Sequence, residues 1–188
     1  MYFDFVKTAI EGTALFPKQV ARLEEQLAGA PNTLEPRLLL VGYYNMHYNC
    51  SAEIRRDRAK HIAWLVRNHP DYDKNLSSFL RVHLLDRQAH QNIARCWNDV
   101  LGTEQAESAV VLRNCAAYFK NHDPLFAEEL FRRALSLSRT PELLEEFERF
   151  IELRPILLCN VADFARQQED DFPIAPELCQ VHGSTAAS

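Results

Sequence analysis

The sequence contains few of the residues and motifs that several common protein classes require. Only five of its 188 residues are glycine, and it has no glycine-rich phosphate loop, Gly-x-Ser-x-Gly motif or His-Glu-x-x-His motif. The longest uncharged apolar run, residues 38–44, is far shorter than the roughly 20 residues that cross a bilayer. These absences argue against a phosphate-loop enzyme, a nucleophile-elbow hydrolase and a membrane-spanning helix.

Cysteine is present but is not arranged for cross-linking or zinc binding. The five cysteines are an odd number at wide intervals, and no Cys-x-x-Cys occurs. Residues 1–7 also lack a basic segment followed by an apolar one, so no secretory signal is visible. The sequence therefore predicts a cytoplasmic protein with reduced thiols and with no metal or other cofactor.

The charge balance is acidic, with a formal net charge of −5. A chain of this charge does not attract phosphate backbones or anionic lipid as a whole. One basic cluster, residues 55–60, follows Tyr43, Tyr44 and Tyr48, and such a mixture could bind single-stranded nucleic acid. The acidic whole favours a solvated helix face instead, so we expect no nucleic-acid or membrane partner.

Helix-forming residues dominate the amino-acid composition. The chain has 24 leucines and 21 alanines, and apolar residues recur at helical spacing almost throughout. No stretch of strict period-two alternation occurs. We therefore predict an all-α protein with a single domain over residues 1–168 and a polar, flexible tail over residues 169–188.

Start and stop signals divide the chain into individual helices. The predicted helices cover residues 18–29, 36–48, 52–68 or 57–68, 86–101, 103–120 and 125–138, and a last one begins at residue 141. Residues 71–85 form either one helix or a short helix and an irregular turn. Asp86 and Thr140 are the expected N-caps, and Pro155 must kink or end the last helix. In the helix before residue 68, Ile54, Arg58 and Ile62 share one face.

The helix pairs repeat with a period. Pro31, Pro70 and Arg139 each follow a helix, and their spacings fit one lengthened unit and two units of about 34 residues. Small and aromatic residues recur at fixed places in the last unit, namely Cys115, Tyr118, Ala127, Phe131, Ala134 and Leu135. The chain thus resembles the tetratricopeptide repeat family over residues 18–139, with a C-terminal capping helix. An ordinary helical bundle is the alternative.

The resemblance implies a protein-interaction module. Such arrays form a right-handed superhelix and bind a peptide or helix of a partner in the groove lined by their first helices. The matching positions assign this groove to Tyr43, Tyr44, His47, Arg113 and Lys120, with Asn45 and Asn121 near its rim. Most places of the family's carboxylate clamp hold Leu, Gly or Ala, which disfavours a receptor for chaperone tails.

Two other functions remain open at this stage. A small helical enzyme or biosynthetic accessory protein would use a pocket between the repeats and the C-terminal helix, with Tyr44, His47, His61 and His83 as its polar groups. Self-association through the apolar face of residues 143–165 would make a homo-oligomer. A metal site from His83, Asp86 and His90 requires a continuous helix, whereas Asp86 as an N-cap places His83 outside it.

Overall fold

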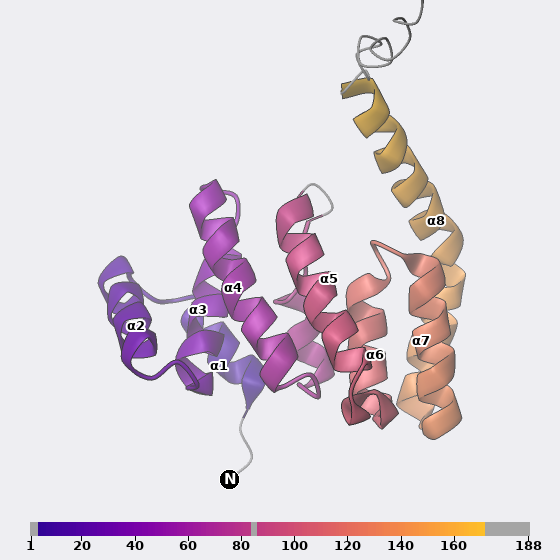
Figure 1. Cartoon of the computed structure of the whole chain (residues 1–188), viewed down its shortest axis with the longest axis horizontal. Coiled ribbons are helices and arrows are strands. Elements are labelled where there is room, and N and C mark those ends of the chain that lie inside the picture. Colours follow the sequence, from indigo (N-terminus) through magenta and orange to yellow (C-terminus); the bar gives the residue numbers. More distant parts are fainter. Residues whose placement is uncertain (1–3, 84–85, 172–188) are drawn as a thin grey trace, which may run out of the picture.

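The chain is helical throughout the part described by the computed structural model, which covers residues 4–83 and 86–171, with side chains up to residue 163 (Figure 1). No strand occurs in these ranges. The α-helices are α1 (Phe5–Gly12), α2 (Pro17–Gly29), α3 (Leu34–Met46), α4 (Ala52–Asn68), α5 (Arg87–Leu101), α6 (Ala109–Phe119), α7 (Pro124–Leu137) and α8 (Pro141–Asp171). Two 3₁₀ turns, η1 (Lys74–Ser78) and η2 (Glu104–Glu107), connect them. The all-α prediction is confirmed.

Local sequence signals place most helix ends. The observed bounds of α2, α3, α4, α5 and α7 agree with the predicted ranges to within two residues. The two expected N-caps form, because Asp86 Oδ1 accepts from the backbone N–H of Ala89 at 3.3 Å and Thr140 Oγ1 accepts from that of Leu143 at 3.3 Å. For residues 71–85 the sequence left open one helix or a short helix with an irregular turn. The described part of this segment has the short helix, which is the 3₁₀ turn η1.

One helix prediction is corrected. Residues 103–120 do not form one helix, because the Thr103 hydroxyl accepts from the N–H of Gln105 and starts the turn η2, and Ser108 is extended. Of the two alternatives for Pro155, a kink or an end, the end is excluded, because the last helix continues to Asp171. Pro155 lies on an exposed face, where water can bind the carbonyl that loses its intrahelical donor.

The first helix, α1, was not predicted. Its N-cap Asp4 accepts from the N–H of Lys7 at 2.9 Å, and it packs against α3. The contact depends on two glycines. A Cβ on Gly42 would lie 1.9 Å from the carbonyl oxygen of Ala9, and one on Gly12 would lie 2.0 Å from that of Leu39. Residues without side chains at both places therefore let the two backbones touch.

Consecutive helices pack into a row with one main core, and α2 is attached to the row by a separate small cluster. In Figure 1 the row runs from α2 at the left to α7 and α8 at the right. Contacts join α3 to α4, α4 to α5, α6 to α7 and α7 to α8. One cluster of buried apolar side chains extends from α1 to α8, and its largest fully buried members are Trp97 and Phe131.

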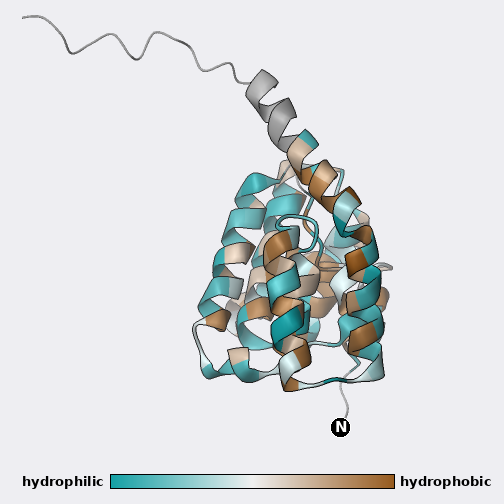
Figure 2. Cartoon of the chain, turned by 90° about the vertical axis from the view of Figure 1, so that its right-hand side faces the viewer, coloured by the Kyte–Doolittle hydropathy of each residue, from teal (hydrophilic) through white to brown (hydrophobic). Residues whose placement is uncertain are grey.

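Helix α8 packs on α7 with its first half and then extends past the rest of the molecule (Figure 1). Two contacts hold the first half: Phe150 packs on Phe131 with ring centroids 5.2 Å apart, and Arg154 pairs with Glu128. Figure 2 shows brown, hydrophobic bands on the part of this helix that projects. Leu153 and Ile156 of the same helix are 49% and 60% exposed. Within the described residues, no helix combines the length and hydropathy needed to cross a membrane.

Candidate functional site

A groove runs between the C-terminal helix and the middle of the row. It consists of two cavities of about 560 and 420 Å³ that share Arg81, Asn121 and Leu157. The larger cavity lies between η1, the end of α6 and α8, and the smaller one extends to the facing ends of α3 and α4. We call the two together the central groove. It combines residues from four regions of the sequence.

The larger cavity has an apolar floor and charged sides. Phe131 and Phe150 are almost completely buried beneath it, and Leu153 and Leu157 of α8 form an apolar wall. The charged lining residues are Lys74, Arg81, Lys120, Arg149, Glu142, Glu145 and Glu146. Helical spacing explains the α8 side, because residues 146, 149, 150, 153 and 157 fall on one face. This cavity can therefore accept apolar side chains next to charged ones.

Positive charges are crowded around Lys120, the residue that follows α6. Burial lowers the pKa of the Lys120 ammonium, and the nearby guanidiniums of Arg81 and Arg149 lower it further. Glu146 opposes this effect. Arg149 is itself paired with Glu145 at 2.7 Å, so its charge is already partly compensated. A ligand with negative charge would relieve the remaining repulsion between Lys120 and Arg81.

The smaller cavity is built around Arg58 of α4, which is only 3% exposed. Its Nη2 donates to Asn45 Oδ1 at 3.0 Å and to the carbonyl of Phe79 at 2.6 Å. Its guanidinium also lies over the ring of Tyr48, 5.1 Å from the centroid. Burial lowers the pKa of Arg58 to about 10. These contacts fix the guanidinium where α3, α4 and the chain after η1 meet.

Three residues that the sequence analysis assigned to a binding groove or its rim line the central groove. Lys120 lines the larger cavity, Asn45 lines the smaller one, and Asn121 lines both. The prediction of Lys120 and Asn121 came from the end of the first helix in the last unit, and α6 ends there. Asn45 precedes Lys120 by 75 positions in the sequence. The two residues reach one groove only because the helices pack in a row.

Arg113 does not line the central groove. Its Nη2 donates to Asn114 Oδ1 at 2.7 Å. Asn114 is fully buried, and its Nδ2 donates to the carbonyls of Pro70 and Tyr72, both at 2.8 Å. Arg113 thus supports an amide that ties α6 to the segment after α4.

Tyr43 and His47 also lie outside the central groove. Their rings stack on the surface of α3 with centroids 4.2 Å apart, and His47 Nδ1 lies 2.8 Å from the carbonyl oxygen of Tyr43. Both side chains are half-buried. They form a local pair within one helix.

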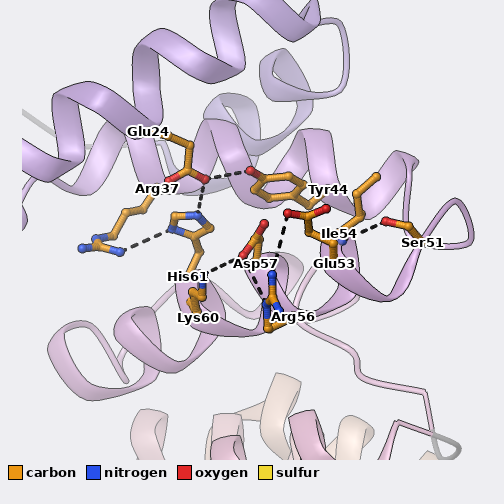
Figure 3. Close-up of polar contacts among 10 residues, drawn as sticks. All are labelled: Glu24, Arg37, Tyr44, Ser51, Glu53, Ile54, Arg56, Asp57, Lys60 and His61. Atoms are coloured by element: carbon orange, nitrogen blue, oxygen red, sulfur yellow. Dashed lines mark hydrogen bonds and ion pairs between the residues drawn. The ribbon is translucent and has the colours of Figure 1, made fainter.

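Tyr44 belongs to a polar network between α2, α3 and α4 (Figure 3). Its hydroxyl donates to Glu24 Oε1 at 2.7 Å, and His61 Nε2 lies 3.0 Å from the same oxygen. Arg37 donates to His61 Nδ1 across 3.3 Å. Nδ1 of His61 therefore accepts, and its Nε2 carries the proton that bonds to Glu24. The His61 hydrogen bond is the largest cause that lowers the pKa of Glu24.

The polar groups named for an enzyme do not share one pocket, although Tyr44 and His61 meet at Glu24. His83 lines the smaller cavity with Tyr48, whereas Tyr44, His47 and His61 line neither cavity of the central groove. Asp86 caps α5, so His83 precedes the helix, and His90 stacks on His122 with ring centroids 3.8 Å apart. Over residues 4–83 and 86–163, no group of three or more His, Cys, Asp or Glu side chains is placed to hold a metal ion.

The structure adds site residues that the sequence analysis did not select, chiefly Arg58, Arg81, Arg149 and Phe150. The sequence offered one signal for Arg58, which shares a helix face with apolar Ile54 and Ile62. A charged residue on a buried face needs a special environment. For Arg81 there was no signal, because it lies in the irregular segment after η1.

Comparison with known proteins adds no relative. No family model, no curated protein and no solved structure matches this chain.

Proposed function

We propose that this protein is an interaction module that binds a segment of a partner protein in the central groove. The observation that carries the proposal is the union of two cavities with an apolar floor and a crowded set of cations. Peptide segments are bound by such a combination, because apolar anchors supply affinity and charges select the partner. The partner segment expected from this lining has apolar side chains and acidic ones.

We further propose that the helix pairs α3–α4 and α6–α7 are units of a tetratricopeptide-like array. The support is the burial of the small residues expected between paired helices, since Cys115, Ala127 and Ala134 are all fully buried. Tyr118 beside them is also buried. In the middle unit the single turn η1 takes the place of a first helix.

The test first selects peptide ligands and then measures their affinity for the protein. The full chain is panned against a random-peptide library, and the selected peptides are labelled and titrated by fluorescence anisotropy. Arg81→Glu in the groove should weaken binding about tenfold or more, because reversing a charge replaces an attraction with a repulsion. Arg22→Glu makes the same change on an exposed position of α2, outside the groove, and should leave the affinity unchanged.

Two results would contradict the proposal. One is a library from which no peptide is enriched above background. The other is a set of peptides whose affinity falls equally in the Arg81→Glu and Arg22→Glu variants, because binding would then depend on overall charge alone. Lys120→Gln provides a second groove variant, since it removes a cation that lines the larger cavity without introducing a carboxylate.

A further inference from the structure

The smaller cavity of the central groove contains a buried cation with no counter-ion. Within the described residues, no carboxylate lies within ion-pair distance, 4.0 Å, of the Arg58 guanidinium. Its Nε is buried and has no hydrogen-bond partner. Burying a charge without a counter-ion is unfavourable, and the hydrogen bonds of Arg58 to Asn45 and Phe79 offset this only in part. A guanidinium in this state is a built site for an anion.

Most of the other residues that line this cavity carry hydrogen-bond donors. The described residues that line it include Arg81 and four asparagines, Asn45, Asn49, Asn121 and Asn160, but no Asp or Glu. Asn45 Oδ1 accepts from Arg58, so Asn45 has its amide N–H groups left to donate. The carboxylate of Asp86 in the adjoining cavity caps α5, and its charge raises the pKa of Arg58 although the two groups form no ion pair. Two guanidiniums in a cavity that no described carboxylate lines favour an anionic ligand.

We propose that the smaller cavity binds a small oxyanion, a carboxylate or phosphate group, held by Arg58 and Arg81. Carboxylate and phosphate groups both carry negatively charged oxygens, and a guanidinium can donate two parallel hydrogen bonds to a pair of such oxygens. The volume of about 420 Å³ is larger than such a group, so the rest of the ligand can lie along the groove. This proposal does not depend on the peptide-binding proposal, because a free small anion would satisfy the same donors.

The experiment titrates sodium phosphate and, separately, sodium acetate into the ¹⁵N-labelled full chain at pH 7. Sodium chloride keeps the ionic strength constant. The Nε–H signal of Arg58 and the side-chain amide signals of the asparagines are followed by NMR. Saturable shifts of these signals support an oxyanion site, and the ion that saturates it at the lower concentration identifies phosphate or carboxylate as the ligand class.

Three variants make the result specific. Arg58→Gln should abolish saturation, but Arg58 also holds the carbonyl of Phe79, so its fold must be checked by near-UV circular dichroism. Arg81→Gln removes an exposed cation of the cavity and should raise the dissociation constant at least threefold. Arg22→Gln is the matched control on α2 and should change nothing. Linear shifts without saturation, or equal binding by the Arg81→Gln and Arg22→Gln variants, would overturn the proposal.

Discussion

Single polar side chains hold helices together where the apolar core is thin. The network of Glu24, Tyr44 and His61 lies beside the small cluster of Val20, Leu27, Leu40 and Tyr44 that packs α2 on α3. Because this cluster is separate from the main core, hydrogen bonds contribute a larger share of the attachment of α2.

Replacing Tyr44 with Phe removes one hydrogen bond from this network and keeps the packed ring. We expect the free energy of unfolding to fall by about 1 kcal/mol, because the Glu24 carboxylate loses a buried donor but remains partly solvated. Urea denaturation measures the change. Tyr43→Phe is the control on the adjacent residue, whose hydroxyl has no hydrogen bond in the described structure, and it should leave the midpoint unchanged. An equal loss in both variants would contradict the role of Glu24.

His122 predicts how stability depends on pH. Burial, together with the nearby charges of His90 and His83, lowers its pKa to about 4, whereas an unfolded histidine titrates near 6.5. Between these values the unfolded chain binds a proton that the folded chain does not bind. Stability should therefore fall as the pH decreases from 7 towards 4.

The comparison is with His122→Phe, which retains a ring to stack on His90 but cannot be protonated. Urea denaturation at pH 7, 6 and 5 should show a steeper loss of the free energy of unfolding for the native chain than for the variant. His122 also has a hydrogen bond with the backbone of Val82. Loss of this bond in the variant changes the free energy of unfolding by the same amount at every pH. Parallel pH profiles for the two proteins would show that His122 is not the titrating group.

At the level of elements, the contact between α1 and α3 depends on backbone proximity. Gly42→Ala would place a methyl group 1.9 Å from the carbonyl oxygen of Ala9 and force the helices apart. We expect a loss of about 2 kcal/mol or more, as for other overpacked cores. Gly29→Ala is the matched control, because no atom lies within 4 Å of its Cβ, and it should stabilise α2 slightly. Thermal unfolding of both variants decides the matter, and equal melting temperatures would refute the close approach.

At the scale of the whole molecule, two thiols report on the opening of the shared core. Cys96 in α5 and Cys115 in α6 are fully buried, and burial raises the pKa of both. Cys50 and Cys159 are exposed. Iodoacetamide labelling with peptide mass spectrometry should modify Cys50 and Cys159 quickly. Cys96 and Cys115 should react slowly and at one common rate, because one opening exposes both. A fast Cys96 beside a slow Cys115 would mean that α5 opens by itself.

The amino-acid sequence by itself determined the all-α class and most helix ends. Each N-cap acts within three residues of its position, as Asp86 does at Ala89, so such signals can be read without a fold. The same local reasoning failed at residues 103–120, where the turn η2 interrupts the predicted helix. At Pro155 it left a kink or an end open, and the structure excludes the end. Helix α1 was missed because its partner, α3, lies 30 residues away.

The groove and its charges were decided by tertiary structure alone. Lys120 and Asn45 meet at one groove only because α3 to α8 pack in a row, and no local pattern encodes that distance. Arg58 is the clearest case. Its basic sequence neighbours predicted a solvated face, and only the apolar Ile54 and Ile62 on its own face indicated otherwise. The structure turns the guanidinium inward, over the ring of Tyr48 and against the carbonyl of Phe79. Local capping and periodicity are short-range effects, whereas burial of a charge depends on every element that covers it.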